Sequence, residues 1–91
     1  MINFKGYALE FTSQAYKKIK KLEKKEAEKI DIKLKELVAG SSNLDIKKMT
    51  GTDTIYRMRC GDYRVVFEVR KEIITIIVID AGHRREIYRD F

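Results

Sequence analysis

Hydrophobic and polar positions along the first forty residues predict one strand followed by a pair of helices. Tyr7, Leu9 and Phe11 occupy every second position, which is typical of a half-buried β-strand. Thr12 and Ser13 come next, and hydroxyl side chains are preferred caps for the first turn of a helix. The chain is therefore expected to run from this strand directly into a helix.

Two apolar sets at helical spacing follow, and they are about one residue out of phase with each other. The first set predicts a helix from about Ser13 to Glu23, and Gly40 provides a natural stop for the second helix. One unbroken helix would place the two sets on different faces, whereas a break near Lys24–Glu26 lets both face one core. The pattern therefore predicts a helical hairpin. Its apolar positions are Ala15, Ile19 and Leu22, then Ala27, Ile30, Leu34, Leu37 and Val38.

The second half of the chain has the pattern of antiparallel strands. Residues 44–49 form a weak, lysine-bearing segment that suits the edge of a sheet. Thr54–Cys60 and Tyr63–Val69 both alternate, and Gly61-Asp62 between them is a two-residue hairpin signal. A second tight turn is expected at Arg70-Lys71.

Ile73–Ile79 is almost continuously apolar, which predicts a central strand covered on both faces. Asp80-Ala81-Gly82 is expected to end this strand, and His83–Phe91 is expected to form a short charged tail. One strand, two helices and three or four antiparallel strands make an α+β two-layer sandwich. No linker or repeat interrupts the pattern, so residues 1–91 are expected to form a single domain.

Composition supports a small globular protein and narrows its location. The 91 residues are 44% hydrophobic, with no proline and five glycines. No run of about 18 apolar residues is present, so no membrane partner is expected. Cys60 is the one cysteine of the chain and has no partner for an internal disulfide, so a cytoplasmic location is the simplest interpretation.

The basic residues differ in type between the two halves of the chain. The net charge of +6 indicates a polyanionic partner, either nucleic acid or an acidic protein. All twelve basic residues in 1–50 are lysines, whereas seven of the eight in 51–91 are arginines. The planar guanidinium group grips phosphate with two parallel hydrogen bonds. We therefore expect the second half to hold nucleic-acid phosphate, although strand positions also favour arginine for its long apolar stem.

Strand alternation gathers several of these arginines on one face of the predicted sheet. Arg57 and Arg59 lie opposite their apolar neighbours, and the hairpin returns Arg64 beside them. If the apolar face packs on the helices, the arginines line the open face. The apolar neighbours expected in the core are Tyr56, Met58, Cys60 and Tyr63. The tail adds further candidates for the site, namely Arg84 or Arg85, His83 and Tyr88.

Such a face suits a phosphodiester under attack, because positive charge is needed where the pentacoordinate intermediate gains negative charge. The reaction also needs a base for the attacking hydroxyl and an acid for the leaving oxygen. With one histidine, one cysteine and no carboxylate cluster, the sequence implies no metal and no cofactor. The simplest metal-free reaction is attack by the 2′-hydroxyl of RNA itself, which yields a 2′,3′-cyclic phosphate and spares DNA.

Three motifs stand out in the second half: Tyr56-Arg57-Met58-Arg59, Gly61-Asp62-Tyr63-Arg64-Val65-Val66-Phe67 and Gly82-His83-Arg84-Arg85-Glu86-Ile87-Tyr88. The opening Leu9-Glu10-Phe11-Thr12 and the lysine-rich helical hairpin accompany them. Together these features resemble the RelE family of the RelE/ParE toxin superfamily over nearly the whole chain. The motifs are specific in combination, whereas any one of them alone is a weak signal.

The resemblance implies the toxin of a type II toxin–antitoxin system, with a RelE-like fold and sheet order 1-5-4-3-2. It implies a metal-independent endoribonuclease that cuts mRNA in the ribosomal A site and so inhibits translation. The implied partners are a cognate antitoxin that wraps the toxin and the ribosome with bound mRNA. The toxin–antitoxin complex is in turn expected to bind operator DNA.

The resemblance also assigns site residues by position. The residues implied as catalytic are Arg57, Arg59, Arg64, Arg84 and Tyr88. The best-studied members of the family carry lysines at the first two of these positions, and a lysine can act as a base whereas an arginine effectively cannot. The base is then Tyr88 or His83, or the rate depends mainly on positioning and charge.

Two other functions share this fold. A ParE-like toxin poisons DNA gyrase by binding, with no chemistry of its own. An inactive relative, retained as a transcriptional co-repressor with its antitoxin, is the second alternative, and the exchange of lysine for arginine keeps it open. Individual residues also have simpler roles, with Cys60 as core filler, His83 as a structural residue and Tyr88 as a stacking platform for a base.

Overall fold

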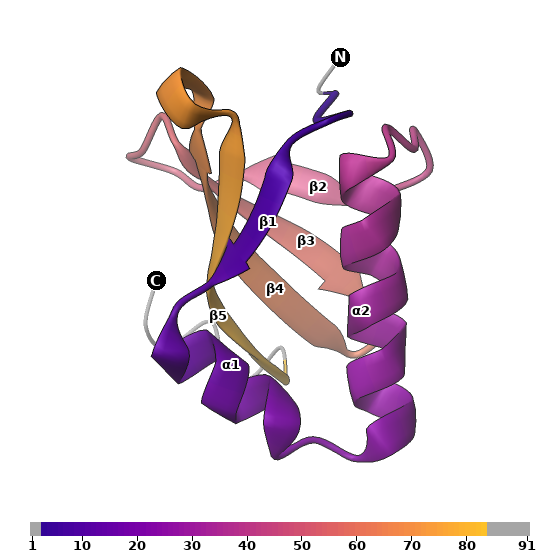
Figure 1. Ribbon diagram of the computed structural model, residues 1–91. Helices are drawn as coiled ribbons and strands as arrows, with labels where there is room; N and C mark the ends of the chain where they lie inside the picture. Colours follow the sequence, from indigo (N-terminus) through magenta and orange to yellow (C-terminus); the bar gives the residue numbers. More distant parts are fainter. Residues whose placement is uncertain (1–2, 84–91) are drawn as a thin grey trace.

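The computed structural model describes residues 3–83 of the chain, which form a five-stranded sheet with two helices on one side of it (Figure 1). The strands are β1 (Ala8–Phe11), β2 (Ile46–Lys48), β3 (Ile55–Cys60), β4 (Tyr63–Arg70) and β5 (Thr75–His83). Their order is β1-β5-β4-β3-β2, with β1 parallel to β5 and the other neighbours antiparallel. The predicted α+β class and the predicted order 1-5-4-3-2 are both confirmed.

The N-terminal half forms the predicted helical hairpin, with shifted boundaries. α1 spans Ser13–Lys20 and α2 spans Lys24–Val38, so the first helix ends earlier and the break lies just before the predicted position. Thr12 is the N-cap of α1, because its hydroxyl oxygen accepts a hydrogen bond from the N–H of Ala15 at 3.1 Å. The chain leaves α2 through Gly40, whose φ of 86° glycine adopts without strain.

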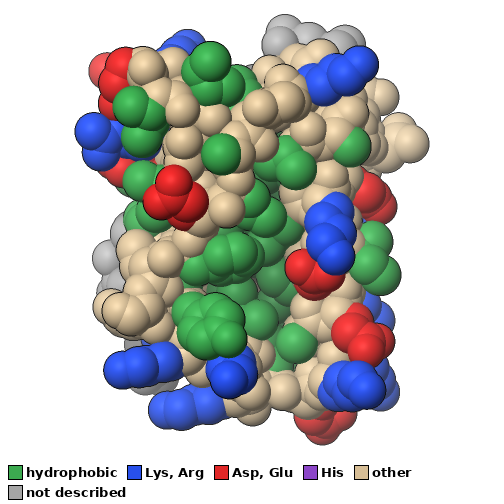
Figure 2. Space-filling model, viewed as in Figure 1, with side chains coloured by type: hydrophobic (Ala, Val, Ile, Leu, Met, Phe, Trp, Pro, Cys, Tyr) green, Lys and Arg blue, Asp and Glu red, His purple; other side chains and the backbone are tan. Residues whose placement is uncertain are grey.

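Both helices turn their apolar stripes toward the sheet, as the phase shift between the two sets predicts. Ala15 of α1 and Ile30, Leu34 and Leu37 of α2 are buried. The helices diverge from the short link between them, so that α1 packs near β5 and α2 near β3 (Figure 1). Figure 2 shows a hollow on this face in which hydrophobic side chains gather. Neither helix in the described part is long and apolar enough to cross a membrane.

The core lies between the helices and the side of the sheet that faces them. The ring of Phe4 contacts the rings of Tyr7, Tyr56 and Phe67 edge-on, with centroid distances of 5.4, 5.8 and 6.0 Å. The sheet contributes the apolar positions that alternation predicts, namely Met58, Cys60, Val65, Phe67 and Val69, with Tyr56 and Tyr63 packed against them.

The central strand begins later than predicted. Ile73, the first residue of the predicted strand, belongs instead to a 3-10 turn over Lys71–Ile73 (η1). The next residue, Ile74, adopts a left-handed conformation with φ of 49°. β5 therefore starts at Thr75, opposite Arg70. The predicted tight turn at Arg70-Lys71 is wrong, because two-residue hairpins require positive φ at their first central position, where glycine, asparagine or aspartate is preferred.

β5 also continues through the Asp80-Ala81-Gly82 segment that is predicted to end it. Val66 and Phe67 are neighbours on β4, but their partners Asp80 and Val78 are two residues apart on β5. One extra residue between these partners forms a β-bulge. The bulge keeps β5 paired with β4 through the predicted stop.

Asp80 is a buried acidic residue at this bulge, and its carboxylate accepts two hydrogen bonds. Its Oδ1 atom accepts a hydrogen bond from the N–H of Ala81 at 2.9 Å and from the Nζ of Lys18 in α1 at 2.7 Å. The side chain of Asp80 is only 7% exposed. The acidic residue therefore ties α1 to the strand instead of interrupting the strand.

Candidate active site

The arginines of the second half meet in a row that crosses the sheet. Arg59 of β3 lies directly opposite Arg64 of β4, and Arg64 lies opposite Gly82 of β5. On the other side, the N–H of Arg59 donates to the carbonyl oxygen of Asp45 at 2.9 Å, which extends the row to the start of β2. Neighbouring strands are about 4.8 Å apart, so this row places three charged residues within about 10 Å of one another.

A second row runs beside the first, displaced by two residues along the strands. Lys47 of β2 lies opposite Arg57 of β3, which lies opposite Val66 of β4. Because alternate residues of a strand share a face, Lys47 and Asp45 project from the same face as Arg57 and Arg59. Arg57 and Arg59 of β3, Lys47 of β2 and Asp45 just before β2 therefore share one side of the sheet.

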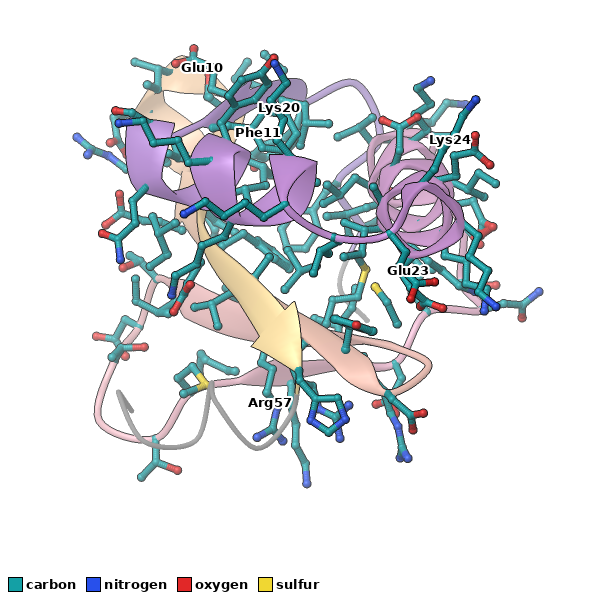
Figure 3. The ribbon with its side chains drawn as sticks, turned by 90° about the horizontal axis from the view of Figure 1, so that it is seen from below. Glu10, Phe11, Lys20, Glu23, Lys24 and Arg57 are labelled. Carbon is teal, nitrogen blue, oxygen red and sulfur yellow. The ribbon has the colours of Figure 1, made fainter. Side chains whose placement is uncertain are left out.

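The two rows enclose a pocket of about 180 Å³, lined by Asp45, Lys47, Arg57, Arg59 and Arg64. Figure 3 shows Arg57 on the side of the sheet that faces away from α1 and α2. Four cationic side chains around one small pocket suit an anion with several oxygens, such as a phosphodiester. Residues 3–83 contain no group of three His, Cys, Asp or Glu side chains placed to hold a metal ion.

Arg64 occupies the predicted face, but it is buried rather than open to solvent. Its residue exposure is 6%, and Val66 on the same face is fully buried. The Nη1 atom of Arg64 donates to the carbonyl oxygen of Tyr63 at 3.2 Å and to that of Gly61 at 3.5 Å. The expectation of an open arginine face is therefore correct for the exposed Arg59 and wrong for Arg64, whose guanidinium is fixed by its own hairpin.

The tail residues of the candidate site are only partly described. His83 ends β5 opposite Tyr63, and the two rings meet edge-on with centroids 5.8 Å apart. Strand alternation places His83 on the face of the sheet that contacts the core, opposite Tyr63. Its neighbour Gly82 lies on the opposite face, in the arginine row. Arg84 and Tyr88, like the alternative Arg85, lie outside the described residues.

Cys60 belongs to the core, on the side of the sheet that faces the helices. It is 3% exposed and packs with the apolar side of the sheet. Burial raises the pKa of its thiol from the ordinary 9.0 to about 11, and Lys33 and Arg64 offset this only in part. The thiolate, which is the nucleophilic form, is therefore scarce at neutral pH.

Asp45 and Lys47 are pocket residues that the sequence pattern did not single out. Residues 44–49 predict only an edge strand, and lysine at an edge is ordinarily a guard against aggregation. Asp45 and Lys47 alternate with the apolar Leu44 and Ile46. This alternation identifies them as residues of the arginine face only when β2 is known to pair with β3. Register, rather than residue type, assigns these two side chains to the site.

Arg70 is a described arginine that lies outside the pocket, at the other end of β4. Its Nε donates to Glu72 at 2.6 Å and its Nη1 to Glu68 at 3.5 Å. These hydrogen bonds raise the pKa of Arg70 and lower the pKa of Glu72. Arg70 is thus an ion-paired surface arginine, and it provides a control for the residues of the pocket.

Toxins of type II toxin–antitoxin systems are similar to this chain in sequence and in fold. A family model described as the ParE toxin of type II toxin-antitoxin system, parDE, matches residues 9–88. The mRNA interferase toxin RelE of Escherichia coli is 31% identical over 89 residues, which cover 93% of each chain.

Solved structures of RelE toxins agree with these sequence matches. The crystal structure of the isolated E. coli RelE toxin gives a TM-score of 0.75 at 29% identity and covers 93% of this chain and 94% of that one. The toxin in the RelB-RelE antitoxin-toxin complex from Methanococcus jannaschii gives 0.74 at 30% identity, covering 90% of this chain and 98% of that one. The sequence motifs, the 1-5-4-3-2 sheet and these relatives agree, and the chain belongs to the RelE family of the RelE/ParE toxin superfamily.

Proposed function

We propose that this protein is a ribosome-dependent mRNA endonuclease, the toxin of a type II toxin–antitoxin pair. The observation that carries the proposal is the pocket in which Arg57, Arg59 and Arg64 converge from two neighbouring strands. Fixed cationic groups favour the negative charge that develops on a phosphodiester under attack, and one such donor contributes about 3 kcal/mol in other enzymes. The name of the E. coli relative, an mRNA interferase, points the same way.

The reaction that fits this pocket is attack by RNA on itself. The 2′-oxygen of one ribose attacks the adjacent phosphorus, the bond from phosphorus to the 5′-oxygen breaks, and a 2′,3′-cyclic phosphate and a 5′-hydroxyl result. The guanidinium groups balance the charge on the phosphoryl oxygens, so the reaction requires no metal ion. A substrate without the 2′-hydroxyl has no nucleophile and stays intact.

The tail is expected to complete this site. The family resemblance implies that Arg84 supplies a further cation to the phosphate, and that Tyr88 stacks on a base or takes part in proton transfer. His83 is a weaker candidate for proton transfer, because it lies beside Tyr63 on the face of the sheet opposite the arginine row. These roles rest on the family resemblance together with the position of Gly82 in the arginine row.

The proposed partners are a cognate antitoxin and the ribosome with mRNA in its A site. The relative from M. jannaschii is named as a complex with its RelB antitoxin, which supports an antitoxin for this chain. The lysines of residues 17–25, in α1 and at the start of α2, provide a positive charge that suits ribosomal RNA. The protein would act in the cytoplasm, and the toxin–antitoxin complex would bind operator DNA.

The match to the ParE family model favours a second candidate function, the poisoning of DNA gyrase by binding alone. In this case the arginine pocket would bind an acidic surface without chemistry. The two functions differ in their product, because one leaves broken mRNA and the other leaves gyrase-dependent DNA breaks.

The test is a cleavage assay with purified protein and ribosomes programmed with a defined mRNA. We expect cuts at the A site with 2′,3′-cyclic ends, and a loss of about 100-fold in rate for Arg59→Ala. Arg70→Ala is the matched control and should cut at the wild-type rate. Intact mRNA with folded wild-type protein would contradict the proposal. A gyrase assay on the same sample then separates a ParE-like poison from an inactive co-repressor.

A further inference from the structure

We propose that Asp45 is the general base that removes the proton from the attacking 2′-hydroxyl. The proposal rests on the endonuclease function above and assigns the role that the arginines of the pocket cannot fill. It places the base immediately before β2, in the row that contains Arg59 and Arg64, rather than in the tail.

The first argument is the composition of the pocket. Of the five described residues that line it, Arg57, Arg59 and Arg64 carry guanidinium groups, which do not give up their proton in proteins. Among these described residues Lys47 is the other cation, and Asp45 is the one carboxylate. A carboxylate side chain is ordinarily in its basic form at neutral pH, whereas a lysine is ordinarily protonated and has no lone pair to offer. Asp45 is therefore the lining residue suited to accept a proton.

The second argument is that the Asp45 carboxylate has no structural task among residues 3–83. It forms no ion pair and no side-chain hydrogen bond there, although four cations line the same pocket. The backbone of Asp45 is fixed, since its carbonyl oxygen accepts the N–H of Arg59 at 2.9 Å. An exposed carboxylate on a fixed backbone is placed to meet a substrate. Asp80, by contrast, is buried and bonded to Lys18.

The third argument is the position of Asp45 relative to the phosphate site. Asp45, Arg59 and Arg64 are consecutive members of one cross-strand row, spaced by about 4.8 Å. In this row Asp45 is the neighbour of Arg59 on the β2 side, and both line the same pocket. The proposal requires that an RNA phosphate bound between Arg59 and Arg64 has its attacking 2′-hydroxyl on that side, within hydrogen-bond reach of the Asp45 carboxylate.

The proton balance of the step is complete without a metal ion. The Asp45 carboxylate takes the proton of the 2′-hydroxyl as the new bond from the 2′-oxygen to phosphorus forms. The bond from phosphorus to the 5′-oxygen breaks, and the leaving oxygen takes a proton from water. The hydroxide that remains recovers the proton from Asp45, so the enzyme returns to its starting state.

The test compares Asp45→Asn with wild-type protein in single-turnover cleavage of ribosome-bound mRNA. General-base catalysis contributes about 10²–10⁴-fold, so we expect at least a 100-fold loss in the rate constant. Affinity for the programmed ribosome should stay unchanged or rise, because the variant removes a negative charge from an RNA-binding pocket. Asp45→Glu should recover most of the lost rate. Asp53→Asn, which removes an exposed acid from the β2–β3 connection outside the pocket, should match wild type in rate and thermal midpoint.

Several outcomes would overturn the assignment. Cleavage by Asp45→Asn at the wild-type rate excludes Asp45 as the base and leaves the endonuclease function intact. A loss of rate that Lys47→Arg reproduces assigns the base to Lys47 instead, since that variant keeps the charge but cannot lose a proton. Wild-type protein that leaves ribosome-bound mRNA intact refutes the endonuclease function itself, and the base assignment falls with it.

Discussion

Arg59 and Arg64 lie directly opposite each other on β3 and β4, so that two cations face each other across one hairpin. Like charges in this position destabilise a sheet, and side-chain pairs of this kind differ by about 0.2–1 kcal/mol. Only two residues, Gly61 and Asp62, separate the strands, which holds the two arginines in this register. The cost is understandable if an anion between the two guanidinium groups is part of the function.

The first prediction is that removing this repulsion stabilises the fold and lowers activity. Arg59→Gln should raise the free energy of unfolding by about 0.2–1 kcal/mol, measured by urea denaturation at low salt. The gain should shrink in 1 M salt, where charges are screened within about 3 Å. Arg70→Gln is the control and should show no gain, because Arg70 pairs with Glu72 and Glu68. An equal gain in both variants would argue against cross-strand repulsion.

The second prediction concerns Arg64, which is buried and hydrogen-bonded to the carbonyl oxygens of Tyr63 and Gly61. Arg64→Lys keeps the positive charge but loses the planar fork, so it should slow cleavage by about 100-fold or more. The rate constant at saturating ribosome concentration is the informative measurement. Activity near the wild-type level in this variant would show that charge alone is enough.

The outline of the fold could be predicted from the sequence, because each element has a strong local pattern. The helical hairpin is encoded in the phase shift between two apolar sets, and the β3–β4 hairpin in Gly61-Asp62. The limits of β5 could not be predicted in the same way. Ile73 and Ile74 have the composition of a strand but form the turn, and Asp80 has that of a turn but lies in the strand. For Asp80 the tertiary ion pair with Lys18 outweighs local propensity.

The site was only partly predictable for a related reason. Alternation within β3 and β4 is a local property, and it correctly groups Arg57, Arg59 and Arg64. Asp45 and Lys47 enter the pocket through pairing between β2 and β3, which no local pattern determines. The burial of Arg64 likewise depends on how the whole chain packs around the hairpin.

The third prediction is that the ion pair between Lys18 and Asp80 is asymmetric. Asp80 is 7% exposed at its side chain and Lys18 is 40% exposed. Lys18→Met leaves a buried carboxylate without its cation and should cost about 1–3 kcal/mol of unfolding free energy. Asp80→Asn should cost less, because the amide oxygen still accepts the Ala81 N–H and the lysine can turn to water.

A double-mutant cycle tests this asymmetry. The variant with both substitutions should be more stable than Lys18→Met alone, since the buried charge is gone. Lys35→Met is the matched control, because the Lys35–Asp31 pair is exposed at both side chains and should contribute less than about 0.5 kcal/mol. Simple additivity of the two substitutions at Lys18 and Asp80 would show that the pair is not coupled.

The fourth prediction is that Ile74 is strained and can be improved. A left-handed conformation costs an L-residue about 1–2 kcal/mol, and the exposed side chain of Ile74 gains little from packing. Ile74→Asn should therefore raise the free energy of unfolding by about 0.5–1 kcal/mol, because asparagine tolerates this conformation. Ile73→Asn is the control, since Ile73 has nearly the same exposure and an ordinary φ, and it should give no gain.

The last prediction concerns the buried thiol of Cys60, whose pKa rises from 9.0 to about 11 on folding. The folded state therefore keeps this proton at a pH where the unfolded chain loses it. The contribution of Cys60 to the free energy of unfolding is unchanged below pH 9 and declines as the pH rises from about 9 to about 11.

The same pKa shift, from 9.0 to about 11, lowers the thiolate fraction at pH 8. The folded thiol should therefore react with a thiol reagent at least about 100-fold more slowly than the thiol of the chain unfolded in urea. Cys60→Ala should lose the decline in stability that the thiol causes above pH 9. Fast labelling of the native protein at pH 8 would mean that Cys60 is more accessible than its 3% exposure indicates.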